Sequence, residues 1–405
     1  MSPRPVSIVL SGIGGMGGVY LKALLEKWES GLFRLAGAVD PFPERSPHLD
    51  QLKDKAVPVY PDLESFYRER EAELAIISSP IQFHAPQTRV ALERGSFVLC
   101  EKPAAATIQE IRDMIEARDR AGRWVAIGFQ WSFSQAVQGL KADIRAGSFG
   151  AARRMECLYT WPRDLAYYAR NDWAGRRRDA GGAWILDSPA NNAMAHDLHN
   201  IFYVLGREID GCAVPVEVEA ELYRTYDIDS YDTAAARFRL GSGTVVLFLV
   251  SHAARSDTGP VVRYEFERGR VEIRGRKSDL RAAFADGRTR NYGPPDADPL
   301  KKLWDVISSV RTGRPPVCGL EAALGQTLAI DGMQDAAAGI ASFPGEIVRF
   351  EPTPSGGRRW VEGLDEAFAR CLEEGRLPSE IGPAWSRPAG RIDLRGYRRF
   401  PSRTG

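Results

Sequence analysis

The stretch that decides the fold is residues 6–25, which reads VSIVLSGIGGMGGVYLKALL. An apolar run from Val6 to Leu10 breaks into glycines, and a helix-like spacing of leucines follows. This order predicts a strand, a tight turn and a helix. The glycines fit the dinucleotide fingerprint G-x-G-x-x-G, in which the first permits the turn, the second lets the backbone approach a pyrophosphate, and the third packs the helix on the strand. These three positions are Gly12, Gly14 and Gly17.

The next apolar run supports this interpretation. A chain with 39 glycines produces such spacings by chance, so the alternative is an ordinary glycine-rich loop. However, the run Leu35–Val39 ends in Asp40, about where the fingerprint expects the carboxylate that binds the ribose hydroxyls. Asp40 would repel the additional phosphate of NADP, which favours NAD. Arg45 lies close enough in sequence to leave NADP open, since a nearby arginine accommodates that phosphate.

The composition is that of an ordinary soluble globular protein with room for two domains. The chain has 405 residues, 44% hydrophobic and 26% charged. Its 54 Lys and Arg nearly balance its 53 Asp and Glu, so no basic field attracts nucleic acid or an acidic membrane. No bilayer-spanning run and no signal peptide are evident. We therefore expect a cytoplasmic protein without a nucleic-acid or membrane partner. Five cysteines without C-x-x-C spacing indicate neither a zinc site nor a disulfide framework.

Short apolar runs alternate with helical patterns through the first third of the chain. The runs Leu74–Ile77, Phe97–Cys100 and Trp124–Phe129 are predicted strands, with helices between them. This alternation predicts a parallel sheet with helices on both faces, an α/β Rossmann domain over residues 1–132. Ligands of such sheets gather beyond the carboxyl ends of the strands. Asp40 and Lys102 both map to that edge.

The second half is rich in strands with period-two alternation, which predicts an α+β domain with a large, mostly antiparallel open sheet over residues 133–342. Two helices, near residues 299–312 and 320–338, are expected to return against its core. Residues 343–405 form a C-terminal extension rich in proline, glycine and arginine. Its end, from Arg387 to Gly405, is predicted as an ordered arm around a partner subunit rather than a loose tail, because its aromatic residues are costly to expose.

Three features together resemble the family of glucose-fructose oxidoreductase, inositol dehydrogenase and the rhizopine-catabolism protein, written Gfo/Idh/MocA. They are the fingerprint with Asp40, the strand-end sequence Glu101-Lys102-Pro103, and a glycine pair, Gly181-Gly182, followed by Asp187 and a histidine-bearing helix that ends at Gly206. The resemblance covers roughly residues 5–340 and implies an NAD(P)-dependent dehydrogenase. It also implies a homodimer or homotetramer formed through the open sheet.

The family's Glu-Lys-Pro motif matches Glu101, Lys102 and Pro103. An ammonium group at the nicotinamide pocket can hydrogen-bond the reacting hydroxyl and stabilise negative charge on its oxygen. The alternative for Lys102 is a surface lysine in an ion pair. His84 resembles a family histidine near the nicotinamide ribose, although a structural role at a helix start is equally consistent. The predicted cofactor-binding residues are Gly12, Ile13, Gly14, Gly15, Met16, Gly17, Asp40, Ser78, Ser79, Pro80, His84, Glu101, Lys102 and Gln130.

The family's D-x-G-x-H pattern is altered here. Counting from Asp187, the histidine position holds Asn191; counting back from Gly206, it holds His196, so an insertion separates the two. If the helix begins early, Asn192 and His196 share one face as an i, i+4 pair. His196 would then be the general acid/base, with Asn192 in the place of the family's aspartate and Asp187 nearby. The alternative is that these histidines are core or capping residues.

Substrate contacts are expected from the segment before the glycine pair. Arginines and aromatic faces suit a sugar, but the same side chains could pack at a subunit contact. The predicted residues are Arg163, Tyr168 and Trp173, with His199 one turn beyond His196. Metal binding by Asp187 and the two histidines is disfavoured, because Lys102 in the same pocket would oppose a cation.

The sequence thus predicts an oxidoreductase that uses NAD, with NADP not excluded, on a secondary hydroxyl or ketone of a sugar, glycoside or cyclitol. One alternative is a glycoside-cleaving enzyme that oxidises its substrate transiently and eliminates the aglycone. Another is a nucleotide-sensing protein without catalysis.

Overall fold

A computed structural model describes residues 4–402, so the predicted arm is described as far as residue 402, and only its positions 403–405 lie outside the described residues. The chain divides into two compact units. The first comprises the described part of Met1–Ala105 together with Gln109–Phe133 and Asp298–Ala323. The second comprises Ala106–Ile108, Ser134–Ala297 and the described part of Leu324–Gly405.

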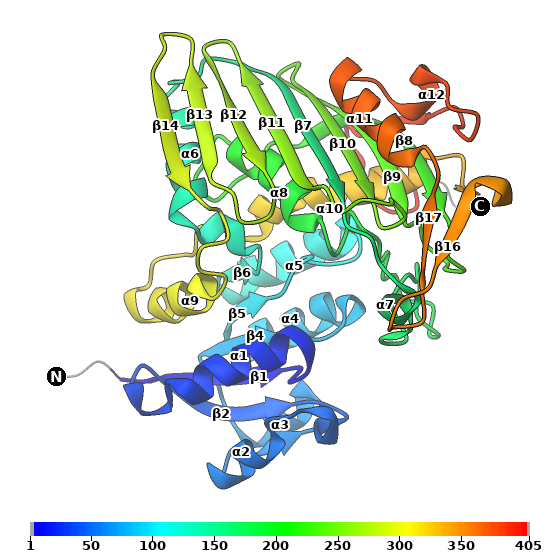
Figure 1. Cartoon of the computed structure of the whole chain (residues 1–405). Helices are drawn as coiled ribbons and strands as arrows, with labels where there is room; N and C mark the ends of the chain where they lie inside the picture. The colour runs from blue at the N-terminus through cyan, green and yellow to red at the C-terminus, as the bar shows by residue number, and fades with distance from the viewer. Residues whose placement is uncertain (1–3, 403–405) are drawn as a thin grey trace. The chain divides into compact units, whose positions relative to one another are not determined.

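The first unit is built on a six-stranded, wholly parallel sheet in the order β3-β2-β1-β4-β5-β6 (Figure 1). Its strands are β1 (Val6–Ser11), β2 (Phe33–Val39), β3 (Val59–Tyr60), β4 (Leu74–Ile77), β5 (Phe97–Cys100) and β6 (Val125–Ile127). Its helices are α1 (Gly15–Glu26), α2 (Leu49–Asp54), α3 (Leu63–Glu69), α4 (His84–Glu93), nearly all of α5 (Ile108–Ala121), and α9 (Lys301–Thr312). Strands β4 and β5 are apolar and almost wholly buried, as expected for parallel strands that are covered on both faces of the sheet. The predicted Rossmann sheet is confirmed.

Helix α9 belongs to this first unit, whereas the sequence pattern placed it with the second sheet. The helix packs on β1 and β5, and its Trp304 ring lies 6.5 Å from that of Phe33. Its Lys302 is buried in an ion pair with Glu101. A pairing across 201 residues leaves no local signal, so the periodicity that predicted the helix could not predict its neighbours.

The second unit contains a ten-stranded mixed sheet in the order β14-β13-β12-β11-β7-β10-β9-β8-β15, with β18 also paired to β8. Its strands are β7 (Ala152–Thr160), β8 (Pro215–Arg224), β9 (Thr233–Leu240), β10 (Val245–Ser251), β11 (Gly259–Phe266), β12 (Gly269–Arg274), β13 (Leu280–Phe284), β14 (Thr289–Gly293), β15 (Ile340–Ser342) and β18 (Gly390–Asp393). The neighbours are antiparallel except β7 with β10 and β8 with β15. The predicted large, mostly antiparallel sheet is confirmed, while β13, β14, β15 and β18 were not predicted.

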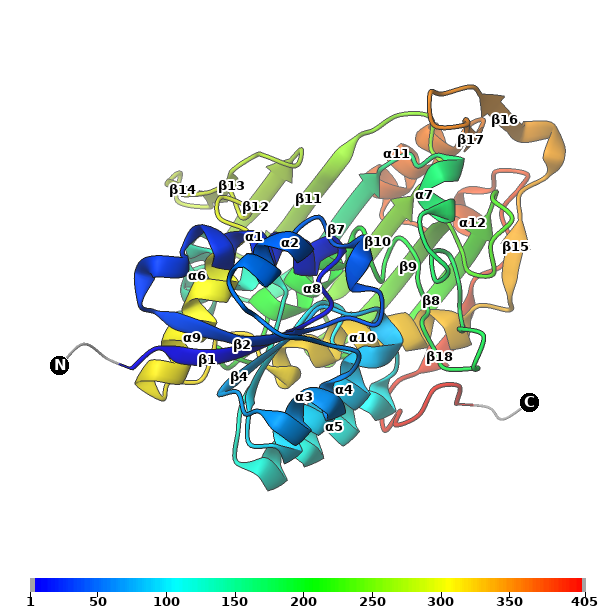
Figure 2. The same ribbon diagram turned by 90° about the horizontal axis from the view of Figure 1, so that it is seen from below.

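Helices cover both faces of the middle of this sheet (Figure 2). The helices of the unit are α6 (Gln135–Arg145), α7 (Leu165–Ala169), α8 (Ala195–Val204), most of α10 (Leu320–Ala336), α11 (Leu364–Glu374) and α12 (Pro378–Ile381). Alternate residues of β7 point to opposite faces: Cys157 lies toward Asp197 of α8, whereas Leu158 packs with α11. Strand β10 is consequently buried on both sides, as its unbroken apolar sequence predicted.

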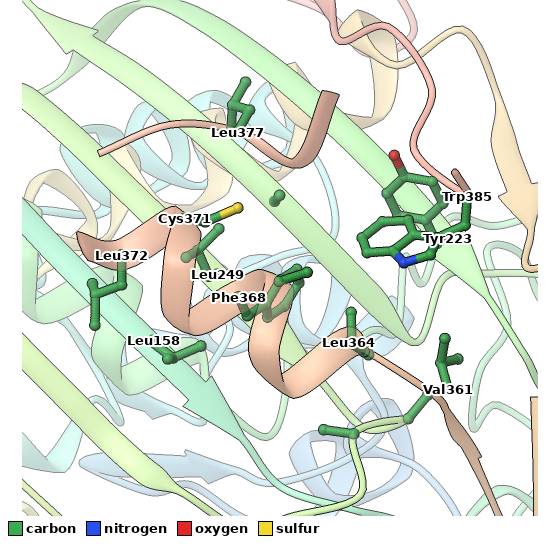
Figure 3. Close-up of a cluster of buried hydrophobic side chains, with 14 of the residues drawn as sticks. Leu158, Tyr223, Leu249, Val361, Leu364, Phe368, Cys371, Leu372, Leu377 and Trp385 are labelled. Carbon is green, nitrogen blue, oxygen red and sulfur yellow. The ribbon is translucent and has the colours of Figure 1, made fainter. Parts of the chain in front are cut away.

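The C-terminal extension folds onto its own chain. Its α11 places Leu364, Phe368 and Leu372 against Leu158 and Leu249 of the sheet (Figure 3). A small hairpin of β16 (Val348–Glu351) and β17 (Arg358–Val361) precedes α11, and β18 follows it. The aromatic residues that argued for an ordered arm, Trp385, Tyr397 and Phe400, are buried. The described part of the arm is therefore ordered, and these aromatic residues pack on the second unit itself, so they give no support to the expected contact with a partner, which stays a prediction.

Within residues 4–402, no helix combines the length and the apolar character needed to cross a bilayer.

Candidate active site

The glycine loop after β1 has the steric properties that a dinucleotide site requires. Gly12 has a positive φ of 81°, and a Cβ there would lie 2.6 Å from the carbonyl oxygen of Ser78. A Cβ at Gly17 would lie 1.9 Å from the oxygen of Gly12, so only glycine lets α1 pack this closely. By contrast, a Cβ at Gly14 would meet nothing within 4 Å. The second fingerprint glycine thus borders open space, which fits the close approach of a pyrophosphate to the helix N-terminus.

Asp40 follows β2 at the same edge of the sheet. Its Oδ2 accepts a hydrogen bond from the Ile13 amide at 3.0 Å, and its Oδ1 accepts one from the Phe42 amide at 2.9 Å. Each carboxylate oxygen keeps a further lone pair for a ribose hydroxyl. Arg45 stacks on the exposed Phe42 ring, 4.3 Å from its centroid. A carboxylate held against the glycine loop favours NAD over NADP.

Replacing Asp40 with alanine is expected to raise the dissociation constant for NAD by about 10-fold or more, because the loss of a hydrogen bond to a charged group costs about 1.5–3 kcal/mol. The relative affinity for NADP should rise at the same time. Calorimetric titration with both nucleotides measures the two effects, and Asp50→Ala, an exposed carboxylate on α2, is the matched control. Unchanged NAD affinity in Asp40→Ala would contradict the assignment.

The segment after β4 also lies at this edge. Ser78, Ser79 and Pro80 are half-buried, and the Ser78 amide donates to the Ser11 carbonyl at 2.8 Å. His84 is fully buried, with Nδ1 2.7 Å from the Pro103 oxygen and Nε2 2.9 Å from the Ser79 oxygen. Burial lowers the pKa of His84, although both carbonyl contacts oppose that shift. This placement favours the structural alternative for His84, which ties the loop after β4 to the loop after β5.

Glu101 is the centre of a buried hydrogen-bonded group. Its Oε1 accepts from the Tyr20 hydroxyl and the Lys302 ammonium group, and its Oε2 accepts from the Lys102 amide at 3.1 Å. Lys302 also donates to the Gly128 carbonyl at 2.9 Å. Burial raises the pKa of Glu101, but Lys302 and the Tyr20 hydrogen bond outweigh burial, so the net pKa is lowered. Glu101 is therefore an anion that holds the backbone of Lys102.

The Lys102 side chain is half-buried and follows β5 at the carboxyl edge, where sequence reasoning placed it. Gln130 is likewise half-buried at the end of β6, in the short 3₁₀ helix Gln130–Phe133. The first unit thus brings together the glycine loop, Asp40, Ser78, Glu101 and Lys102 at one edge of the sheet. Tyr20 and Lys302 support this edge and were missed by sequence reasoning. Lys302 follows another lysine, Lys301, on α9, so the local sequence carries no signal for its role.

In the second unit, the loop before α8 is organised by Asp187. Its Oδ2 accepts from the Gly175 amide at 2.7 Å, and its Oδ1 accepts from the Asn192 side chain at 2.9 Å. The preceding Leu186 is buried with a positive φ of 52°, a conformation that is strained for a branched side chain. Such strain persists only where surrounding contacts enforce it, and the hydrogen bonds from Gly175 and Asn192 hold the Asp187 carboxylate that follows.

The expected helical pairing of Asn192 with His196 is wrong. Helix α8 begins at Ala195, and residues 188–194 form turns in which the Asn192 amide donates to the Ser188 carbonyl at 2.9 Å. Asn192 therefore pairs with Asp187 rather than sharing a helix face with His196. Asn191 is buried, donates to the Leu186 carbonyl and accepts from Gln326, so its role is to hold the loop on α10.

The two histidines of α8 differ in environment. His196 is half-buried near the start of the helix. His199 is 1% exposed, and its ring stacks on that of Tyr203 at 5.4 Å. Burial, together with the neighbouring Lys141, holds the pKa of His199 well below its usual value. His199 is thus a neutral core histidine, which does not favour the predicted substrate contact, whereas His196 keeps accessible surface.

Asp197, between these histidines, is buried against the sheet. Its pKa is raised to about 7 by burial, and the charge of Arg276 only partly offsets this. The native state therefore binds one more proton than the unfolded chain between about pH 4 and pH 7, so Asp197 lowers stability progressively as the pH rises through that range.

Asp197→Asn is consequently expected to stabilise the protein at pH 8, by up to about 4 kcal/mol, and to change little near pH 4. Urea unfolding of both proteins at several pH values measures this difference. Asp50→Asn, exposed on α2, should show no such pH dependence. A constant difference between the Asp197 variant and the native chain at all pH values would contradict the expectation.

The predicted substrate residues lie beyond the ends of the parallel pair β7 and β10. The Arg163 amide donates to the His252 carbonyl at 3.0 Å, which continues the pairing of the two strands. Tyr168 contacts His252 Nδ1 through its hydroxyl at 3.0 Å. Trp173 lies beside the Arg170 guanidinium group, 5.1 Å from it. Since Arg170 Nη2 lies 4.0 Å from Asp187 Oδ2, these residues and the Asp187 loop form one group within the second unit.

Comparison with known proteins matches both units. The description "Oxidoreductase family, NAD-binding Rossmann fold" fits residues 6–129, and "GFO/IDH/MocA C-terminal domain" fits residues 137–281. The first unit is therefore an NAD-binding Rossmann domain. Among solved structures, the WlbA dehydrogenase of Bordetella pertussis in complex with NADH and UDP-GlcNAcA has a TM-score of 0.65 at 19% identity, covering 81% of this chain and 94% of that one. At this identity the likeness shows the fold.

Two curated relatives illustrate the range of sequence identity and of coverage. A 1-carboxy-3-chloro-3,4-dihydroxycyclo hexa-1,5-diene dehydrogenase of Comamonas testosteroni is 31% identical over 157 residues, which span 38% of this chain and only 37% of that protein. An inositol 2-dehydrogenase of Pseudomonas fluorescens is 23% identical over 306 residues, covering 71% of this chain and 82% of that protein.

Proposed function

Because the chain belongs to the Gfo/Idh/MocA family, we propose that it is an NAD-dependent dehydrogenase acting on a secondary hydroxyl of a sugar, glycoside or cyclitol, or on the corresponding ketone. The observation that carries this proposal is the buried Glu101 group, which fixes Lys102 at the same sheet edge as the glycine loop and Asp40. The relatives include dehydrogenases named for inositol and for D-glucoside.

The residues divide the work. When bound, the nicotinamide ring supplies a site for reversible hydride transfer. Lys102 donates a hydrogen bond to the substrate oxygen and stabilises the negative charge that develops there. His196 accepts the hydroxyl proton, because a neutral imidazole is a base near neutral pH. Asp187, fixed by Gly175 and Asn192, accepts a hydrogen bond from a further hydroxyl and orients the sugar. NADP remains open as a second nucleotide, and a homodimer or homotetramer stays a prediction that light scattering can check.

A panel of polyols, sugars and glycosides with NAD tests the proposal through the absorbance of NADH. Net NADH formation with at least one substrate is expected. Glycoside cleavage without net NADH would favour transient oxidation and elimination, and nucleotide binding without any turnover would contradict an enzymatic role.

His196→Gln should lower turnover by about 100-fold or more with NAD affinity unchanged. His48→Gln, on the surface loop before α2, is its control.

A further inference from the structure

A ladder of alternating aromatic and guanidinium groups stands beyond the ends of β7 and β10. It consists of Trp161, Arg163, Tyr167, Arg170 and Trp173. The Arg163 guanidinium group lies 3.7 Å from the Trp161 ring centroid and 4.5 Å from that of Tyr167. Arg170 lies 3.7 Å from the Tyr167 centroid and 5.1 Å from that of Trp173. Both guanidinium groups thus lie over aromatic rings, and Arg170 also donates a hydrogen bond to the Tyr167 carbonyl.

The positive charges of this region are not equally compensated. Arg276, which also stacks on Trp161, forms an ion pair with Asp257 at 2.6 Å. Arg170 has Asp187 at 4.0 Å. Arg163 pairs with no carboxylate among residues 4–402, and its Nε is buried without a hydrogen-bond partner. Its neighbour Asp164 turns to the Tyr167 amide and the Ser355 hydroxyl instead.

Arg163 is half-buried and its Nε is inaccessible to water, and stacking on two rings offsets only part of the cost of desolvating a cation that has no carboxylate partner among the described residues. Burial lowers the pKa of Arg163, consistent with a desolvated cation. The adjacent His252 does not supply negative charge. It is 1% exposed, its Nε2 is buried without a partner in the described chain, and burial together with Arg163 and Arg170 holds its pKa well below the usual value. Among residues 4–402, Arg163 is thus the arginine of this ladder that has no carboxylate within ion-pair distance, while Arg170 has Asp187.

We propose that the substrate of this enzyme is a sugar or cyclitol that carries a carboxylate, and that Arg163 binds this carboxylate through two parallel hydrogen bonds. The inference rests on the proposed function, since it names the substrate class of the same site. A carboxylate carries one charge and matches the planar fork of a guanidinium group. A phosphate monoester carries about −1.5 to −2 and would leave charge uncompensated beside a single free cation.

The test compares probes that differ only at C6: D-glucose, D-glucuronate and D-glucose 6-phosphate, with galactose and galacturonate as a second series. Calorimetric titration of the NAD-saturated full chain should show a uronate binding about 10-fold or more tightly than its neutral sugar. Arg163→Met should weaken uronate binding by about 10- to 100-fold while changing neutral-sugar binding less than threefold, and Arg163→Lys should restore part of the preference. Arg276→Met removes a stacked but paired arginine and should leave the preference intact.

Neutral sugars that bind as well as the uronates, tighter binding of the phosphate, or no binding of either uronate would overturn the inference. An equal loss of affinity for all sugars in Arg163→Met would also overturn the inference, because it would mean that Arg163 supports the structure of the ladder and does not bind the carboxylate. The proposed function is judged separately, by NADH formation. If uronates bind in a way that depends on Arg163 but no NADH forms, the inference about the carboxylate stands and the proposed function fails. If neutral sugars are oxidised and Arg163 makes no difference, the proposed function stands and the inference fails.

Discussion

Lys102→Met is expected to lower turnover by about 100- to 1,000-fold while NAD affinity stays within about twofold of the native value, because an electrostatic or proton-transfer contact to the reacting oxygen is worth that much in the transition state. Methionine keeps the length of the side chain and removes the charge. Glu101, which accepts the hydrogen bond from the Lys102 amide, is unchanged, so the backbone of the loop should stay in place.

Initial rates from NADH absorbance and a separate NAD titration measure the two quantities. Lys22→Met, an exposed lysine on α1, is the control and should leave both unchanged. Lys102→Arg should recover little activity, since the wider, planar guanidinium group cannot occupy the position of an ammonium group. Native turnover in Lys102→Met would remove this residue from the mechanism.

Lys302→Met is expected to destabilise the chain by about 3–5 kcal/mol, because it leaves the Glu101 carboxylate buried without its counter-ion. Both partners are nearly fully buried, with side-chain exposures of 1% and 8%. At about 2–4 °C per kcal/mol for a protein of this size, the melting temperature should fall by about 10 °C. The neighbouring Lys301→Met removes a half-buried lysine that pairs with Asp305 on the same helix, and should cost less than about 1 kcal/mol.

The pH dependence gives a second readout. In the native chain, the pKa of Glu101 is lower than in the unfolded chain. Its contribution to stability is therefore complete above the pKa of the unfolded state and is lost as the pH falls through the pKa of the folded state. Without Lys302, burial is opposed only by the Tyr20 hydrogen bond and the charge of Lys102, so the pKa of Glu101 should rise and its stabilising contribution above the unfolded pKa should shrink. Adding Glu101→Gln to Lys302→Met removes both charges and should recover part of the loss. An unchanged melting temperature and pH profile in Lys302→Met would show that the ion pair is not part of the folded unit.

Local patterns in the sequence predicted what local physics determines. The glycine fingerprint, Asp40, and the strands β4, β5, β9 and β10 were predicted at or within a few residues of their positions, because burial on both faces or a steric need for glycine leaves a direct mark on the residue types. Strand β14, with the sequence TRNYG, carries no such mark, since its residues are exposed or half-exposed at the sheet edge.

What the sequence did not predict depends on distant contacts. Lys302 is 201 residues from Glu101, and its role follows only from the packing of α9 on the first sheet. The pairing of Asn192 was mispredicted because helical spacing was extended through residues 188–194, where Ser188 and Asp187 instead hold turns through side-chain hydrogen bonds. A pattern of spacing cannot show that side chains compete with the backbone for these bonds. The uncompensated charge of Arg163 is also a property of what surrounds it in space.

The placement of α11 over the sheet has a consequence for how this protein responds to dilution. A face covered by another subunit is protected only while subunits are associated, so its coverage follows mass action and falls as the protein concentration falls. Here Leu158 and Leu249 are covered by Phe368 and its neighbours from the same chain. Their cover is tethered and its effective concentration is set by chain connectivity. This part of the sheet therefore stays closed to water at any protein concentration at which the chain is folded.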